Sequence, residues 1–179
     1  MACRFNMIKF FSLETGEMKS KRIEGQGLHQ LSLSEKYKIL AVGEYNRIHI
    51  LNMDTFKEIA VWNNQKTISK LTILEDRNEL VCVEDKYMKP SIHSIISKGP
   101  EYSIVYFHDL NNGQIVRKIN CHSVVDSIFL RDLGQKMVTI DKSRREIRTW
   151  DIDNEVCENI VKIGDVFSDG IKNVFLNYD

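Results

Sequence analysis

A seven-residue pattern occurs four times in the chain and constrains the fold more than any other feature. The most complete copy, residues 146–152, reads Glu-Ile-Arg-Thr-Trp-Asp-Ile and contains the only Trp-Asp dipeptide of the sequence. Each copy alternates apolar and polar residues and is followed by a short polar turn, which is typical of a half-buried β-strand entering a hairpin. The other three copies are residues 7–13, 47–53 and 104–110.

The spacing of these copies indicates the fold class. When the copies are aligned on the Trp-Asp dipeptide, the steps between them are 40, 57 and 42 residues. A period near 40 built from short strands is typical of a β-propeller, whose blades are four-stranded sheets. We therefore expect an all-β protein made of four-stranded antiparallel sheets. The aligned pairs are Phe11 and Ser12, Leu51 and Asn52, His108 and Asp109, and Trp150 and Asp151.

Strand-like segments divide the chain into complete and partial units. Four such segments occur in each of residues 28–63, 68–120 and 124–163. Residues 7–25 form a half unit with two strands, because we expect no pair of strands from the few residues before Met7. Residues 171–179 have the pattern of the start of a further unit. The unit 68–120 also contains an insertion, residues 85–101, which lengthens one step and includes both prolines of the sequence.

Composition narrows the class of protein. The formal net charge is zero, with 42% apolar and 28% charged residues, which is typical of a globular chain. A protein built mainly to bind nucleic acid or an anionic membrane needs a basic excess, so neither partner is expected. No apolar run approaches the roughly 20 residues of a membrane helix, and the first residues lack the apolar core of a signal peptide. The four cysteines show no Cys-x-x-Cys spacing, so a reduced, cytoplasmic location is expected.

No motif for catalysis or cofactor binding stands out. The sequence has no Gly-rich phosphate loop and no Gly-x-Ser-x-Gly elbow. Its five histidines and four cysteines match no zinc spacing, so no metal and no cofactor are expected. An enzyme would need carboxylates or histidines that converge from the first strands of the units. Those strands offer only His29 and Asp126, so we expect a protein that is not an enzyme.

Residues 146–152, with His122 lying 28 residues before Trp150, resemble the WD-repeat family of β-propellers. The resemblance extends from Met7 to Leu176. It implies a buried hydrogen-bond network among a His, a Ser or Thr of the second strand, a tight-turn Asp and the Trp. The expected turn position, residues 143–145, holds no Asp, and Asp141 lies just before it, so the network should be incomplete or rearranged. The motif residues are His122, Thr139, Trp150 and Asp151, with His108 and Asp109 in the preceding unit.

The number of units is below that of a usual propeller in this family, which closes with about seven blades. An open arc would leave apolar sheet faces exposed. Three arrangements therefore stay open. The chain could be part of a longer propeller, it could be completed by another copy or another protein, or it could close as a small ring. In that ring, residues 171–176 would join the strands of residues 7–25.

The resemblance implies a non-catalytic scaffold that binds other proteins or peptides. Two alternatives are an RNA- or phosphate-ligand-binding propeller that uses a basic rim loop, and a propeller enzyme. Two loops on one rim are the expected contact sites, since one carries an apolar cluster and the other a basic cluster. The residues of the first loop are Tyr87, Met88, Ile92, Ile95 and Ile96. Those of the second are Arg144, Arg145 and Arg148.

Overall fold

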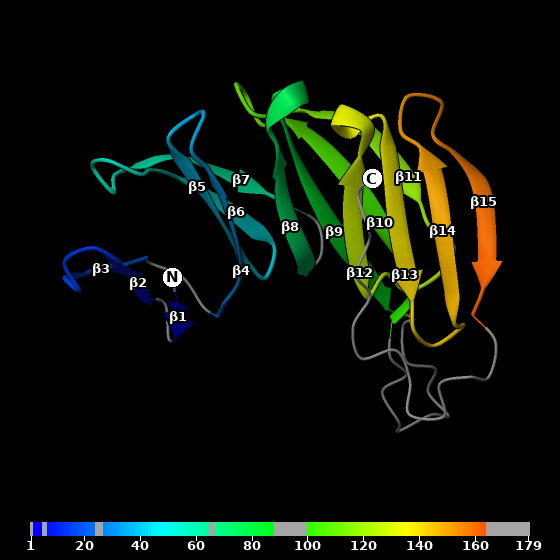
Figure 1. Ribbon diagram of the computed structural model, residues 1–179, viewed down its shortest axis with the longest axis horizontal. Coiled ribbons are helices and arrows are strands. Elements are labelled where there is room, and N and C mark those ends of the chain that lie inside the picture. The colour runs from blue at the N-terminus through cyan, green and yellow to red at the C-terminus, as the bar shows by residue number, and fades with distance from the viewer. Residues whose placement is uncertain (1, 5–6, 24–26, 65–66, 88–99, 164–179) are drawn as a thin grey trace.

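The computed structural model describes residues 2–4, 7–23, 27–64, 67–87 and 100–163. Within these residues, every regular element is a strand apart from two single-turn 3-10 helices. The strands form four antiparallel sheets, each in simple sequence order. Figure 1 shows the sheets side by side in an arc, with the first and the fourth at opposite ends of the long axis. The alternating apolar pattern of the repeats therefore produces sheets, as the sequence predicted.

The first sheet has three strands, β1 (Ala2–Arg4), β2 (Met7–Phe11) and β3 (Met18–Arg22), in the order β1-β2-β3. Strand β2 contains the first copy of the repeat, so it takes the third position of a blade and β3 the fourth. Strand β1 then takes the second position. The sequence predicted two strands here, whereas the short segment before Met7 adds one, with Cys3 opposite Ile8. The first position, beside β1, holds no strand among the described residues.

The second sheet is an antiparallel meander, in which each strand pairs with the next. Its second strand consists of the apolar run Ile-Leu-Ala-Val-Gly followed by Glu44, and it is buried on both faces because it lies between two neighbouring sheets. The outer strand alternates between exposed and half-buried residues, as expected of a strand at a sheet edge. The strands are β4 (Leu28–Ser34), β5 (Ile39–Glu44), β6 (Arg47–Asn52) and β7 (Glu58–Asn63).

The third sheet contains the two longest strands of the described chain. Its strands are β8 (Ile68–Leu74), β9 (Glu79–Tyr87), β10 (Pro100–Asp109) and β11 (Ile115–Asn120). The pairing of β9 with β10 continues as far as Tyr87 opposite Pro100. The insertion predicted for residues 85–101 is therefore not a loop throughout, since its two ends extend the hairpin. Residues 88–99 lie outside the described part.

The fourth sheet consists of β12 (Ser127–Arg131), β13 (Lys136–Asp141), β14 (Glu146–Asp151) and β15 (Val156–Lys162). Its first strand begins at Ser127 rather than at the predicted residue 124, because residues 121–126 serve as the linker from the third sheet. The predicted start of a further unit, residues 171–179, lies outside the described residues. The two 3-10 helices, η1 (Glu75–Arg77) and η2 (Asp132–Gly134), occupy equivalent positions between the first and second strands of their sheets.

Apolar side chains are buried between successive sheets rather than within them. Ile8 of the first sheet packs with Leu40 and Leu51 of the second. Ile48 and Ile50 of the second pack with Leu80 and Ile104 of the third. The third core joins Val81, Val105 and Phe107 of the third sheet to Met137 and Trp150 of the fourth. Each face of an inner sheet is thus covered by the neighbouring sheet, which is how blades pack in a propeller.

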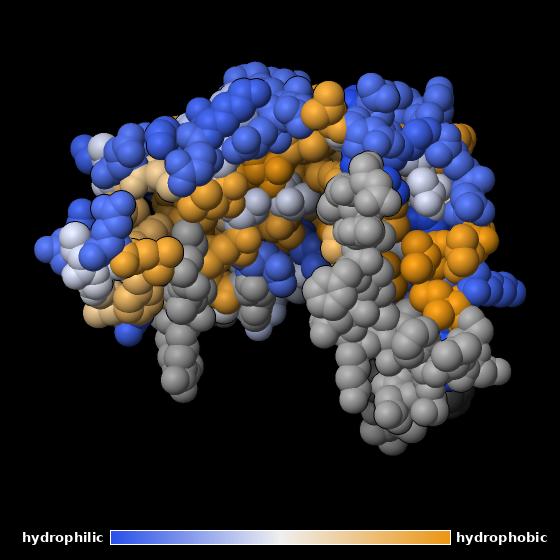
Figure 2. Space-filling view, viewed as in Figure 1, coloured by the Kyte–Doolittle hydropathy of each residue, from blue (hydrophilic) through white to orange (hydrophobic). Residues whose placement is uncertain are grey.

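The surface follows from this arrangement. Figure 2 shows polar side chains over the upper rim, where the turns lie, and apolar side chains in a band across the face below it. A groove of about 490 Å³ lies between β4, β8 and β12, the first strands of three sheets. Leu33, Ile73 and Phe129 contribute to its apolar lining, and Glu75 and Asp76 contribute acidic groups.

The turns between third and fourth strands allow a matched test of packing between sheets. Gly16 and Gly113 have similar left-handed backbones, with φ of 70° and 73°. A Cβ at Gly16 would meet nothing within 4 Å, whereas one at Gly113 would lie 2.5 Å from Nε1 of Trp62. Gly16→Ala should lower the free energy of unfolding by about 1 kcal/mol through backbone strain. Gly113→Ala should lower it by about 2–4 kcal/mol because overpacking adds to the strain. Urea unfolding of both variants measures the difference, and equal losses would contradict the contact with Trp62.

Candidate functional site

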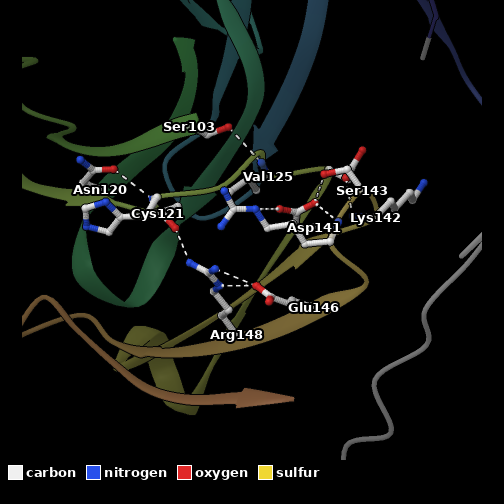
Figure 3. A network of polar contacts seen from close by, with 12 residues as sticks. Ser103, Asn120, Cys121, Val125, Asp141, Lys142, Ser143, Glu146 and Arg148 are labelled. Carbon is white, nitrogen blue, oxygen red and sulfur yellow. Dashed lines mark hydrogen bonds and ion pairs between the residues drawn. The ribbon is translucent and has the colours of Figure 1, made fainter. Parts of the chain in front are cut away.

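The two loops that the sequence singled out lie on neighbouring sheets. The β9–β10 hairpin rises from the third sheet, and the β13–β14 turn belongs to the fourth. Residues 121–126 link the two sheets, and a network of hydrogen bonds fixes this linker against both of them (Figure 3). The candidate site is the rim formed by the hairpin, the linker and the turn, called the hairpin rim below.

Ser103, which is fully buried in β10, is the centre of this network. Its hydroxyl donates to Oδ1 of Asp85 at 2.7 Å and accepts from the backbone N–H of Val125 at 2.9 Å. Its backbone N–H donates to the carbonyl of Ser123 at 2.9 Å, and its carbonyl accepts from the N–H of Cys121 at 3.1 Å. One residue therefore joins the root of the hairpin to three points along the linker.

Arg148 is buried beneath the linker (Figure 3). Its Nη1 donates to the carbonyl of Cys121 at 2.6 Å, while Nε and Nη2 donate to Oε2 of Glu146 at 3.2 Å and 2.7 Å. The prediction that Arg148 forms part of an exposed basic cluster is therefore wrong. A buried charge must be paired, and here the charge is neutralised by Glu146 and used to hold the linker.

The β13–β14 turn is organised by Asp141, whose side chain is buried. Its Oδ1 accepts from the hydroxyl of Ser143 at 2.6 Å and from the backbone N–H of Arg144 at 2.9 Å. Its Oδ2 lies 3.7 Å from Nε of Arg144. Arg145 takes a left-handed backbone with φ of 54°. Asp141 thus supplies the turn carboxylate that the sequence lacked at residues 143–145, and it compensates the charge of Arg144.

The two first-strand residues considered for an enzyme lie on different elements of the fold. Asp126 lies in the linker, where its Oδ2 accepts from the backbone N–H of Lys142 at 2.7 Å. His29 belongs to β4 of the second sheet. Among the described residues, no group of three His, Cys, Asp or Glu side chains is arranged to hold a metal ion. In the same part of the chain, no helix has the length and apolar content to cross a membrane.

The Trp of the repeat motif makes a buried polar contact. Nε1 of Trp150 donates to Oγ1 of Thr139 at 2.9 Å. His122 does not join them, which corrects the expectation from the resemblance. Its side chain is exposed and its backbone has φ of 51°. It lies in a turn closed by its own N–H donating to Oδ1 of Asn120 at 3.0 Å.

The third sheet contains an equivalent pair with different chemistry. His108 lies opposite Leu80, as Trp150 lies opposite Met137, so Cys82 corresponds to Thr139. Nδ1 of His108 donates to the carbonyl of Gly113 at 3.0 Å. Nε2 can therefore accept from the Cys82 thiol, whose sulfur is 3.5 Å away. The role of Cys82 was not predicted, although an alignment of the second strands of the units gives it the same position as Thr139.

Burial decides the chemistry of this Cys–His pair. Desolvation raises the pKa of the Cys82 thiol to about 12 and lowers the pKa of the His108 imidazole. Both groups are then neutral at neutral pH, and a nucleophilic thiolate is not populated. The pair is a structural contact and not an activated Cys–His nucleophile. Trp62 stacks on the His108 ring with 5.8 Å between ring centroids.

A second buried histidine, His49, was also missed. Its Nδ1 lies 2.7 Å from Oε2 of Glu58, and its Nε2 lies 3.1 Å from Oε2 of Glu44. Glu44 and His49 are both buried, whereas Glu58 is half exposed. The three side chains join β5, β6 and β7 across the second sheet. Sequence spacing gave no signal for this cluster, because only the pairing of β5, β6 and β7 brings the two carboxylates to the imidazole ring of His49.

The two remaining motif residues, Asp151 and Asp109, stabilise chain turns. Oδ1 of Asp151 accepts from the backbone N–H of Asn154 at 2.9 Å, and its Oδ2 lies 3.3 Å from Nζ of Lys136. Oδ1 of Asp109 accepts from the N–H of Asn111 at 2.7 Å in the corresponding turn of the third sheet. Both carboxylates fix the turn between the third and fourth strands of their sheets.

Comparison with known proteins supports the fold. No family model matches the sequence, and no curated protein matches it. Solved structures do match, among them a chain of the crystal structure of the mitotic checkpoint complex, with a TM-score of 0.68 and 12% sequence identity. The match covers 87% of this chain and 44% of that one, so this chain spans less than half of its length. The fold is propeller-like. Because 810 chains of known structure match, the likeness selects no activity.

The Trp150–Thr139 hydrogen bond can be tested by a double-mutant cycle. Thr139→Val keeps the shape of the side chain but leaves the buried indole N–H without its acceptor, which should lower the free energy of unfolding by about 1–3 kcal/mol. In a Trp150→Phe background, the same change should cost about 1 kcal/mol less, because the donor is already absent. Urea unfolding of the four proteins gives the coupling. Strict additivity would show that the hydrogen bond does not contribute.

Asp151 should make stability depend on pH in acid. Hydrogen bonds from Asn154 and Lys136 lower its pKa from 3.8 to about 2 in the folded chain. A depressed folded pKa stabilises the protein above the unfolded value, and this contribution is lost as the pH falls through the folded value. Asp151→Asn should therefore be less stable than the wild type above about pH 4, and the difference should shrink towards pH 2. Urea unfolding of both proteins across this range measures it. A constant difference would contradict the assignment.

Proposed function

We propose that this chain is a WD-type propeller module that binds other proteins through the hairpin rim and catalyses no reaction. The observation that carries the proposal is the β9–β10 hairpin. Its strands have 9 and 10 residues, whereas the other strands of the three four-stranded sheets have 5 to 7. The excess length lies beyond the Asp85–Ser103 pair and ends where Tyr87 lies opposite Pro100.

The root of the hairpin supports a binding role. Asp85 and Ser103 lie opposite each other at the point where the extra pairing begins, and their hydrogen bond ties both strands to the linker. A binding surface on a rigid root loses less conformational entropy when a partner docks. The long hairpin would therefore hold its last described pair, Tyr87 and Pro100, in a fixed direction.

The contact residues follow from the sequence of the tip. Tyr87 ends β9, and Met88, Ile92, Ile95 and Ile96 lie outside the described residues. We assign these five residues to an apolar contact with the partner. Arg144 and Arg145 on the adjacent turn complete the rim. The Arg144 side chain is 50% exposed, so its guanidinium group can bind an acidic group of the partner while its Nε stays close to the carboxylate of Asp141.

The WD-type assignment draws on several features together. The Trp150–Thr139 contact, the Asp151 turn and the period near 40 support it. The similar solved chain comes from a multi-protein complex, which agrees with a role in protein binding. The unpaired thiols of Cys82, Cys121 and Cys157 agree with a reducing, cytoplasmic location.

The test is partner capture by a double variant, Ile92→Asp with Ile95→Asp. Each aspartate would place a charge in an apolar contact, so affinity for a captured partner should fall at least 100-fold, as for loss of interface hot spots of about 2 kcal/mol each or more. The Tm should be unchanged. Partners captured by the wild type are quantified by mass spectrometry and their affinities are then measured with purified proteins.

A matched control carries the same chemistry elsewhere on the same sheet. Ile115 and Val116 on β11 are 56% and 46% exposed, so replacing both by Asp adds equal charge without touching the hairpin rim. Capture should survive in this control. Equal loss in both variants would remove the hairpin rim as the site. A large drop in Tm for the Ile92 and Ile95 variant would place those residues in a core instead.

A further inference from the structure

The groove beside the two 3-10 helices lies where three sheets bring their first strands together. It has a volume of about 490 Å³ and is bordered by β4, β8 and β12. Figure 1 shows β8 and β12 as neighbours near the middle of the arc. Strand β9 begins next to η1 and ends in the long hairpin, so the groove and the hairpin rim lie at opposite ends of this strand. The groove is therefore a separate surface from the hairpin rim.

A hydrogen bond joins the first strands of the second and third sheets at the level of the groove. The backbone N–H of Ile73 in β8 points away from β9 and donates to Oγ of Ser32 in β4 at 2.8 Å. A first strand pairs within its sheet on one side only, so the backbone groups on its other side need a partner from elsewhere. Ser32 supplies that partner and closes the seam between β4 and β8.

Strand β12 turns the same kind of backbone edge towards the groove. The carbonyl of Gln135 accepts from the N–H of Ile152 at 3.0 Å, on the side of β14. Because backbone groups alternate in direction along a strand, Met137 also directs its groups towards β14. Leu130 lies opposite Met137, so its own N–H and carbonyl point away from β13. Leu130 therefore presents a donor and an acceptor on the free edge of its sheet.

The contact that caps β8 has no counterpart on β12 in the described part of the chain. The strand pairings give Thr72 of β8 the position that Ser32 has in β4, and they give Leu130 the position of Ile73. Among the residues that the structure describes, however, neither the Thr72 hydroxyl nor the Leu130 N–H has a hydrogen-bond partner. The seam between β8 and β12 is thus open, and the groove offers polar backbone groups to a ligand.

Two large apolar side chains line the groove instead of joining a core. Leu33 of β4 is 41% exposed, and Phe129 of β12 is half-buried. Both line the groove, and the three cores formed by the described residues contain neither of them. Covering exposed apolar surface contributes roughly 25 cal/mol per Å². The groove therefore favours a ligand that carries an apolar side chain.

The two charged residues of the described groove lining are both acidic. Oε1 of Glu75 accepts from the buried hydroxyl of Ser34 at 2.5 Å, which fixes the carboxylate. Asp76 follows Glu75 in η1 and is exposed. Two neighbouring bases are bound elsewhere, since Lys36 donates to the backbone carbonyl of Glu75 at 3.1 Å and Arg77 donates to groups of the fourth sheet. The carboxylates therefore favour a basic group of a ligand.

We propose that this groove binds an extended peptide segment of a partner protein, with an apolar side chain against Leu33 and Phe129 and a Lys or Arg beside Asp76. The peptide pairs with the free edge of β12, where the N–H of Leu130 donates to a carbonyl of the peptide. Strand addition of this kind draws affinity from main-chain hydrogen bonds and specificity from the side-chain contacts. The two carboxylates disfavour an acidic peptide.

Selection of short random peptides displayed on phage against the purified 179-residue chain supplies the probe. The enriched sequences should combine an apolar residue with Lys or Arg. A synthetic peptide of the consensus sequence, labelled with fluorescein, then gives the affinity by fluorescence anisotropy. No enrichment, or a consensus with acidic residues, would overturn the proposal.

Charge reversal tests whether the peptide lies in the groove. Asp76→Lys should weaken binding of the consensus peptide by about tenfold or more, because a repulsion replaces an attraction. Asp54→Lys is the matched control, since Asp54 is exposed in the β6–β7 turn and does not line the groove. It should change the affinity by about twofold at most. Equal losses in the two variants would overturn the proposal. So would a loss in the Ile92→Asp and Ile95→Asp double variant with none in Asp76→Lys, because the peptide would then lie on the hairpin rim.

The backbone contact has a readout of its own. Amide hydrogen exchange, followed by NMR, should slow by about tenfold or more at Leu130 when the consensus peptide is saturating, because the N–H becomes hydrogen-bonded. The Ile73 amide is the internal control, since Ser32 already accepts from it, and its exchange should change by about twofold at most. Unchanged exchange at Leu130, or equal slowing at both amides, would overturn the pairing of the peptide with β12.

Discussion

A four-stranded sheet has two faces and cannot cover either of them by itself. The whole structure depends on this constraint. Each apolar core lies between two sheets, so the stability of one sheet is inseparable from that of its neighbours. The linkers are for this reason as important as the strands, because they set the orientation of one sheet relative to the next. The contacts of Ser103 and Arg148 with residues 121–126 fix the position of the linker between the third and fourth sheets.

The equivalent pairs in successive sheets show which part of the repeat is constrained by packing. The fourth sheet uses Trp150 and Thr139, joined by a hydrogen bond, and the third uses His108 and Cys82. The second places Leu51 and Val42 at the same positions, and both are fully buried. Each pair therefore has a larger side chain on the third strand and a smaller one on the second, whereas its polarity differs from sheet to sheet. Packing between sheets requires a large side chain at the third-strand position. A polar contact between the third-strand and second-strand residues is present in the third and fourth sheets and is not possible between Leu51 and Val42 of the second.

The sequence was informative wherever a signal repeated along the chain. The period near 40 indicated the sheets, and the apolar run of β5 indicated its burial on both faces. Strand β1 was missed because three residues carry no periodicity. The buried position of Arg148 was missed because it depends on the Cys121 carbonyl, which comes close only after two sheets have packed. His122 was misassigned because a left-handed turn directs its side chain to solvent, and local sequence does not reveal such a turn.

The hairpin root has a mechanical consequence. Because Asp85 and Ser103 tie β9 and β10 to the linker and, through it, to Arg148 of the next sheet, the hairpin cannot bend at its base without disturbing the packing of two sheets. A force applied to the end of the hairpin would be transmitted to the interface between the third and fourth sheets. The contacts of both sheets at this interface would then resist the force together.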